Sequence, residues 1–114
     1  MARELSHPDA GDVSLDAVLA ALADPVRRTI LAQLARGHHD QACLAFDLPV
    51  SKSTSTHHFR VLREAGLITQ RYEGTAILNA LRTDDVEARF PGLVSSVIQA
   101  ERRARADGAA PADG

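Results

Sequence analysis

The sequence is poor in cysteine, in aromatic residues and in long apolar runs. Cys43 is its one cysteine, which excludes an intrachain disulfide and suits a reducing compartment. No apolar run approaches the roughly 20 residues that a membrane-spanning helix needs, and the first residues lack the apolar segment of a signal peptide. We therefore expect a cytoplasmic protein with no membrane partner.

Catalytic signatures are also missing from the sequence. No nucleophile with an adjacent base, phosphate-binding loop or carboxylate pair is visible, and helix caps and solubility account for the scattered acids. Apolar residues make up 45% of the 114 residues, enough for one small core built mostly from Leu, Val, Ile and Ala. We expect a single folded domain that is not an enzyme.

The charges are unevenly distributed along the chain. The net charge is −2, which by itself argues weakly against nucleic acid. However, residues 51–82 hold five basic residues against two acidic ones, an excess of three, whereas residues 1–24 hold one Arg against five acids. The positive charge is thus concentrated in one segment, as contact with phosphate requires.

The first third of the chain predicts an arm and two helices. Residues 1–13 are polar and without periodicity, so we expect a disordered N-terminal arm. Ser14 suits the N-cap of a first helix, whose apolar residues recur at i, i+3, i+4 and i+7. Asp24-Pro25 then predicts the start of a second helix, which runs to Arg36.

Residues 51–67 form the most informative stretch. Phe59, Leu62 and Ala65 mark one apolar helical face, and Gly66 suits the left-handed end of the helix. The opposite face is polar and mostly hydroxylic or cationic, which suits the DNA major groove, although a solvated face of an ordinary helix is the alternative. With a short helix predicted over Gln41–Asp47, the pair makes a helix-turn-helix.

The periodicity changes after this helix. Residues 67–72 and 75–81 are rich in β-branched residues and predict two strands, joined by a turn at Glu73-Gly74. A hairpin placed directly after a DNA-reading helix is a wing, and its tip residues could reach sugar and phosphate. The alternative is an ordinary ribbon that closes the core.

The C-terminal third predicts a short helix after Thr83 and a last helix over residues 93–105, followed by a disordered tail at 106–114. The fold class is therefore mainly α with a small β-hairpin. We expect a winged helix-turn-helix domain over residues 14–105, with about five helices and a two-stranded antiparallel wing.

Two motifs give the sequence a family resemblance. Residues 20–37 (AALADPVRRTILAQLARG) and residues 53–68 (STSTHHFRVLREAGLI) resemble the ArsR/SmtB family of winged-helix transcription regulators. The resemblance implies a homodimer formed by the first and last helices, a helix-turn-helix that reads DNA, and a β-hairpin wing. It also implies that a metal ion or another small inducer changes the affinity for the operator.

The resemblance and the residue patterns together define two candidate surfaces. The DNA-binding set comprises hydroxylic, basic and aromatic side chains: Lys52, Ser53, Thr54, Ser55, His57, His58, Arg60, Arg71, Tyr72 and Thr75. The dimer-interface set comprises apolar residues of the two terminal helices: Leu15, Val18, Leu19, Leu22, Val94, Val97 and Ile98. For His58, an inward orientation that binds the scaffold is the open alternative.

The metal-binding patterns of the family are missing from this sequence. The thiolate pattern needs a second cysteine near Cys43, and no histidine follows His58, as a site on the last helix would require. The remaining nitrogen and oxygen ligands are His7, Asp9, His38, His39 and Asp40. They suit Ni²⁺ or Zn²⁺, and the alternative is that His38-His39-Asp40 is a solvated connector.

The leading hypothesis is a homodimeric, sequence-specific regulator that binds a pseudo-palindromic operator in double-stranded DNA and responds to nickel or zinc. The alternative is a winged-helix protein-interaction module, with the sensing function supplied by a separate partner protein. A linear fall of log K with log salt separates the two, since only DNA binding releases counterions from phosphate.

Overall fold

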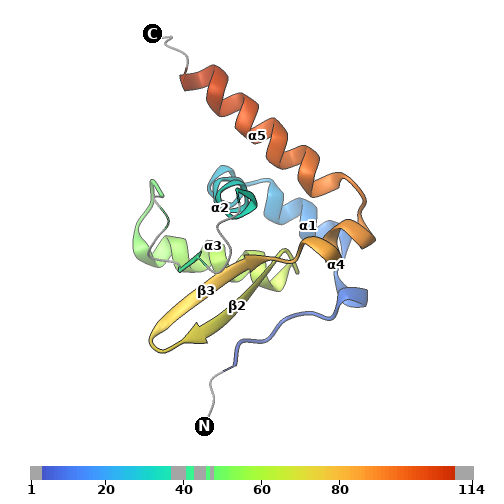
Figure 1. Cartoon of the computed structure of the whole chain (residues 1–114), viewed down its shortest axis with the longest axis vertical. Coiled ribbons are helices and arrows are strands. Elements are labelled where there is room, and N and C mark those ends of the chain that lie inside the picture. Colours follow the sequence, from blue (N-terminus) through green and yellow to red (C-terminus); the bar gives the residue numbers. More distant parts are fainter. Residues whose placement is uncertain (1–3, 37–40, 43–45, 47, 110–114) are drawn as a thin grey trace.

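We describe the protein from a computed structural model, which covers residues 4–36, 41–42, 46 and 48–109. The elements are η1 (Ala10–Asp12), α1 (Leu15–Leu22), α2 (Pro25–Ala35), β1 (Gln41–Ala42), α3 (Lys52–Glu64), β2 (Ile68–Glu73), β3 (Ala76–Leu81), α4 (Thr83–Arg89) and α5 (Leu93–Ala109). Figure 1 shows the β2–β3 hairpin below the helices and α5 projecting away from it. The predicted winged helix-turn-helix class is confirmed.

The first two helices begin where the sequence predicts. The Ser14 hydroxyl accepts a hydrogen bond from the Ala17 N–H at 3.1 Å. The Asp24 carboxylate accepts from the N–H groups of Val26 at 2.8 Å and Arg27 at 3.2 Å, with Pro25 at the first helical position. These caps satisfy backbone donors that a helix leaves unpaired at its start.

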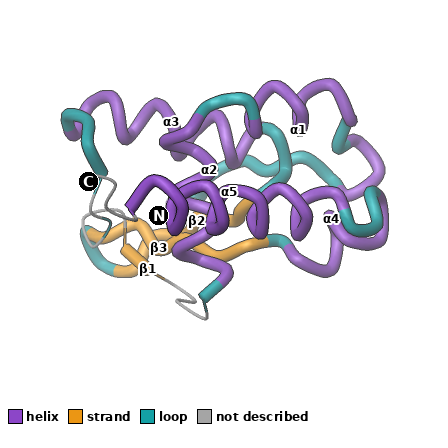
Figure 2. Tube along the Cα trace, turned by 90° about the horizontal axis from the view of Figure 1, so that it is seen from above, coloured by secondary structure: helices purple, strands orange, loops and turns teal. Residues whose placement is uncertain are grey.

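The core surrounds α2, which contacts α1, α3, α5 and β3. Figure 2 shows α1 and α3 along one side of the molecule and the hairpin along the other, with α2 between them. The fully buried side chains come from almost every element: Val18, Ile30, Leu31, Leu34, Phe59, Leu62, Leu67 and Ile68. Each stabilises the fold by about 1.5–3 kcal/mol through burial.

The sheet has three strands in the order β1-β3-β2, all antiparallel. β2 and β3 form the predicted hairpin, but the turn lies at Gly74-Thr75 rather than at Glu73-Gly74, because Glu73 pairs with Ala76. Gly74 has a φ of +63°, as a tight hairpin turn requires.

The expected helix over Gln41–Asp47 is wrong at its start. Gln41 and Ala42 form β1 and pair with Asn79 and Leu78 at the free edge of β3, a long-range contact that a local pattern cannot reveal. Residues 43–45, including Cys43, and Asp47 lie outside the described residues.

The end of α3 is fixed by Gly66. The Gly66 N–H donates to Arg63 O and the Leu67 N–H donates to Leu62 O, both at 3.0 Å, which is the Schellman pattern around a residue with a φ of +87°. A Cβ on Gly66 would lie 2.5 Å from Val13 Cγ2. Glycine is therefore required here by both conformation and space.

Residues 4–13 correct the expectation of a disordered arm over residues 1–13. Val13 is buried against Gly66, and its carbonyl accepts from Arg89 Nε at 2.6 Å. The Arg82 guanidinium donates to the Pro8 carbonyl at 2.8 Å, and the Gln70 N–H donates to His7 Nε2 at 2.9 Å. These partners are distant in sequence, so composition alone did not reveal them; residues 1–3 lie outside the described part.

α5 is longer than expected, because it continues through residues 106–109 of the predicted tail to Ala109. Glu101 anchors it: its carboxylate accepts from Arg28 Nε at 2.7 Å and from Arg105 Nε at 2.8 Å. The Arg28 hydrogen bond holds the pKa of Glu101 below its ordinary value. Over the described ranges, no helix is both long and apolar enough to cross a membrane.

We predict that Gly66→Ala lowers the free energy of unfolding by about 2–4 kcal/mol, since it adds a left-handed-φ cost to a clash with Val13. Urea denaturation measures this change. Gly74→Ala is the matched control: its φ is also positive but nothing lies within 4 Å of its Cβ, so we expect a loss of about 1 kcal/mol. Equal losses in the two variants would contradict the role of Val13.

Candidate nucleic-acid interface

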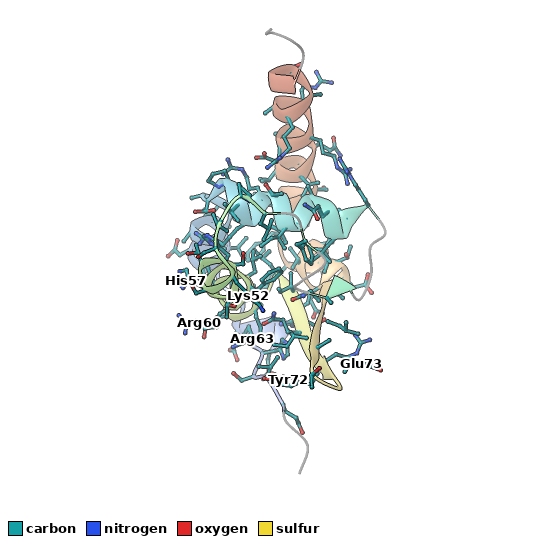
Figure 3. The ribbon with its side chains drawn as sticks, turned by 90° about the vertical axis from the view of Figure 1, so that its left-hand side faces the viewer. Lys52, His57, Arg60, Arg63, Tyr72 and Glu73 are labelled. Carbon is teal, nitrogen blue, oxygen red and sulfur yellow. The ribbon has the colours of Figure 1, made fainter. Side chains whose placement is uncertain are left out.

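One side of α3 is exposed and polar. Its exposed side chains are Lys52, Ser53, Thr54, Thr56, His57 and Arg60, with Ser55 half-buried. Figure 3 shows Lys52, His57 and Arg60 on the side of the molecule that also carries the hairpin residues Tyr72 and Glu73. The predicted DNA-binding residues of α3 are therefore brought to one face, with the exception of His58.

The start of this helix is built from hydroxyl groups. Ser51 Oγ caps α3 by accepting from the Thr54 N–H at 3.3 Å, and it lies 2.9 Å from Thr54 Oγ1 and 3.3 Å from Ser53 Oγ. Short side chains allow another molecule to approach the positive end of the helix dipole closely. This end of α3 suits a phosphate group.

Arg60 lies two turns further along the exposed side. Its guanidinium donates to His57 Nδ1 at 3.3 Å, which favours one orientation of a long side chain. A planar guanidinium holds its further N–H donors in a fixed fork, and it is the group that most often reads guanine through O6 and N7. Arg60 is therefore the α3 residue best suited to contact a base edge.

The opposite side of α3 is held rigidly in the core. Phe59 and Leu62 are buried, and the Phe59 ring meets the Phe46 ring edge-on with centroids 5.1 Å apart. A helix with one face packed in this way cannot rotate about its axis without exposing large apolar surface. The orientation of the polar face is thus set by the core.

His58 does not belong to the exposed face, which corrects its place in the predicted DNA-binding set. It is only 7% exposed, and its Nδ1 accepts a hydrogen bond from Arg27 Nη1 at 3.1 Å. Burial lowers the pKa of His58, and the positive charge of Arg27 adds to this effect while Asp24 opposes it. The lowered pKa favours the neutral ring, and the ring has the inward orientation, bound to the scaffold, that was the open alternative.

The adjacent arginines of α2 were missed as functional residues by sequence reasoning. Besides His58, Arg27 binds the carbonyls of Ala20 at 3.2 Å and Ala21 at 2.7 Å at the end of α1. Arg28 binds the Leu22 carbonyl at 2.9 Å and Glu101 of α5. The adjacent pair of arginines at the start of an amphipathic helix could have indicated these contacts. A reader of the sequence alone would assign both arginines to a solvated face.

A polar chain connects α3 with the hairpin. Arg63 Nη1 donates to Gln70 Oε1 at 2.8 Å, and Gln70 Nε2 donates to the buried Asn79 Oδ1, also at 2.8 Å. Buried polar groups that are mutually satisfied favour one geometry over others. The chain therefore fixes the position of the hairpin relative to α3.

The predicted wing residues lie toward the hairpin tip. Arg71 and Thr75 are exposed and Tyr72 is half-buried, with Tyr72 opposite Ile77 on β3. They remain compatible with contact to a DNA backbone, as predicted for a wing.

The predicted dimer-interface set divides into two groups. Leu15 and Leu19, four residues apart on α1, are 48% and 46% exposed and offer an apolar surface. Val97 is half-buried. Val18, Leu22, Val94 and Ile98 are buried in the core of the protomer itself, so they have little surface left to offer a second subunit.

The predicted metal ligands are not brought together in the described residues. His7 Nε2 accepts from Gln70, the ring also hydrogen-bonds the Leu5 backbone, and burial lowers its pKa, with Arg63 and Arg82 nearby. Asp9 is exposed next to η1, while His38, His39 and Asp40 lie outside the described residues. Across residues 4–36, 41–42, 46 and 48–109 no group of three or more His, Cys, Asp or Glu could hold a metal ion. The described residues thus hold no metal-binding group, and a nickel or zinc response stays a prediction.

Comparison with known proteins places this geometry in a family. Residues 24–70 match the model for bacterial regulatory proteins of the arsR family. The fold matches the ArsR-like transcriptional regulator from Rhodococcus sp. RHA1 with a TM-score of 0.57 and 31% identity, over 81% of this chain and 87% of that one. The chain belongs to the ArsR family.

Curated relatives of this ArsR-family chain are transcription regulators. The HTH-type transcriptional regulator Rv2034 of Mycobacterium tuberculosis is 42% identical over 79 residues, 62% of this chain and 74% of that protein. The transcriptional repressor SdpR of Bacillus subtilis is 33% identical over 66 residues, 58% of this chain and 73% of that one. The protein is thus a DNA-binding transcription regulator and not an enzyme.

The buried His58 gives a prediction for pH. Because its pKa is lowered in the fold from an ordinary value of 6.5, the unfolded chain binds more protons around that pH. The free energy of unfolding should therefore fall as the pH is lowered from above 6.5 toward the folded-state pKa. Urea denaturation at a series of pH values should show a shallower fall in His58→Asn.

His57→Asn is the matched control for this series, because the His57 ring is exposed. It should follow the wild-type dependence. The same dependence in all three proteins would contradict a buried, neutral His58.

Proposed function

We propose that the protein acts as a homodimer and reads a roughly palindromic operator with one α3 from each subunit in successive major grooves. The observation that carries the proposal is the exposed polar face of α3, whose opposite face is fixed in the core. A helix with short hydroxyl side chains at its start and an arginine further along fits the width and the base pattern of the major groove.

The charge distribution supports contact with phosphate. Lys52, Arg60 and Arg71 are exposed, and they lie within the segment that holds the excess of positive charge. One copy carries too few of these charges for tight binding, since each neutralised phosphate adds a limited amount to affinity. Two copies on one operator double the number of contacts.

The exposed leucines of α1 support the dimer. Leu15 and Leu19 present a continuous apolar strip on a helix whose other face is fully buried. In an isologous interface the same strip from two subunits covers itself, and the two-fold axis places both copies of α3 for half-sites about 34 Å apart. The terminal helices would then set the spacing of the reading helices.

Arg60→Ala tests the assignment of the base-reading residue. Each subunit loses one bidentate pair worth about 1–3 kcal/mol, so a dimer loses two pairs, and its affinity for an operator selected from a random DNA library should fall roughly 30-fold or more. Specificity should relax at one position per half-site. Fluorescence anisotropy over a range of salt concentrations measures both, together with the salt dependence of binding.

Arg103→Ala is the matched control, because it removes the same charge from an exposed position on α5, away from α3. It should bind like the wild type. If Arg60→Ala keeps full affinity and specificity, Arg60 does not read a base. If the measured DNA affinity does not depend on salt concentration, the protein does not neutralise phosphates, and a protein-interaction module is favoured instead.

Leu19→Glu tests the interface. Two copies of the introduced charge meet near a two-fold axis, so dimer affinity should fall at least about thirtyfold, a cost of about 2 kcal/mol or more. Sedimentation equilibrium measures this change. Ala88→Glu, on the exposed side of α4, is the control and should sediment as the wild type does. An unchanged dimer in Leu19→Glu would place the interface elsewhere.

A further inference from the structure

A cavity of about 240 Å³ lies where four elements meet. Its walls come from the end of α2, the base of the hairpin, α4 and the first two turns of α5, with apolar side chains from each: Leu34, Leu67, Leu81, Val86, Val94 and Ile98. Figure 1 shows α4 and the start of α5 adjoining the base of the hairpin. The cavity is on the opposite end of the hairpin from the tip that faces DNA in the proposed function.

One side of this cavity is formed by residues of the domain core. Leu34, Leu67 and Ile98 are buried in the domain core and line the cavity with only part of their surface. The other side of the cavity opens to solvent, where the lining includes the exposed residues Ala35 and Ser95. A mostly apolar hollow of this kind favours apolar molecules, because their binding removes apolar surface from water.

Three polar side chains of the lining, those of Arg82, Glu87 and Ser95, already have partners. The Arg82 guanidinium donates to Asp85 at 2.8 Å and to the Pro8 carbonyl, and the Glu87 carboxylate accepts from the Gly92 N–H at 2.9 Å. The Ser95 hydroxyl donates to the Gly92 carbonyl at 3.3 Å. A charged ligand would have to displace these contacts, whereas an uncharged apolar ligand would leave them intact.

We propose that this cavity binds a small, uncharged, largely apolar molecule, and that its occupation changes the affinity of the protein for DNA. A dry cavity of about 150 Å³ holds benzene, so the volume here suits roughly ten non-hydrogen atoms, the size of a bicyclic ring. The volume also lies below the 300 Å³ or more typical of sites for drug-sized ligands and cofactors. Nucleotides and peptides are therefore too large.

The cavity wall connects to the elements that position DNA contacts, and this half of the proposal rests on the proposed function. Leu67 directly follows Gly66, which ends α3, and its carbonyl accepts from the Arg82 N–H at 3.0 Å at the base of the hairpin. Val94 and Ile98 belong to α5. A ligand that separates these walls would shift α5 relative to α3 and the wing, and so alter the spacing of the two copies of α3.

Indole is a direct probe, because the protein contains no tryptophan and indole fluorescence can be excited selectively. Titration of the full chain should give a saturable blue shift with one site per protomer, and the methyl NMR signals of Leu34, Val86 and Ile98 should move. Indole-3-carboxylate, which has the same ring with a charge, should bind at least tenfold more weakly. Failure of both indole and borneol to move these methyl signals at millimolar concentration would overturn the proposal.

Variants that fill the cavity locate the site. Ala35→Leu and Ser95→Leu each add bulk at an exposed position of the lining and should weaken indole binding at least tenfold. Ala88→Leu makes the same change on α4 outside the lining and should bind indole as the wild type does. Circular dichroism checks that each variant is folded. Equal indole binding in all the variants would place the ligand elsewhere and overturn the assignment.

The effect on DNA is measured separately. At saturating indole the affinity for the selected operator should change at least fivefold in the wild type, and it should not change in Ala35→Leu. By thermodynamic linkage, operator DNA should change the affinity for indole by the same factor. Binding of indole with a change in operator affinity below twofold would overturn the regulatory half. Because the indole titration needs no DNA, a protein that binds indole but no operator would refute the proposed function while leaving the site established.

Discussion

The architecture depends on two neighbouring arginines at the start of α2 that face different partners. Arg27 binds the last carbonyls of α1 and the ring of His58 on α3, while Arg28 binds the Leu22 carbonyl and Glu101 on α5. The last carbonyls of a helix have no partner within it, and they form the negative end of its dipole. A guanidinium group donates hydrogen bonds to these carbonyls and also places a positive charge at the negative end of the dipole. Through these contacts α2 holds α1, α3 and α5 in one fixed arrangement.

This arrangement explains why α3 presents a constant face. Phe59 and Leu62 hold one side of the helix in the core, His58 fixes its rotation through Arg27, and Gly66 ends it in a defined geometry against Val13. A DNA-reading helix must be placed to within a fraction of its own diameter, because hydrogen bonds to base edges fail when donor and acceptor separate. The rigid side of α3 therefore matters as much as its polar side.

The N-terminal segment and the hairpin form a second unit around the edge strand β2. His7 accepts the hydrogen bond of the Gln70 N–H, and Arg82 holds the Pro8 carbonyl beside it. An uncovered strand edge exposes backbone groups that can pair with another chain. The segment covers part of that edge, and the chain Arg63–Gln70–Asn79 connects the same strand with α3. The cavity at the base of the hairpin lies next to this unit, which is why a ligand there could reach the DNA-binding elements.

The sequence by itself determined the elements whose signals are local. Ser14, Asp24-Pro25 and Gly66 marked helix boundaries because their side chains or φ angles act within a few residues. Together with the motifs of residues 20–37 and 53–68, they were enough for the fold class and the family.

Only the tertiary structure decided the remainder. It assigned His58, Val18 and Ile98 to the core, paired Gln41 with Asn79, and placed residues 4–13 against the hairpin. Each of these outcomes depends on partners far away in the chain, and periodicity cannot distinguish an apolar residue that faces its own core from one that faces a second subunit.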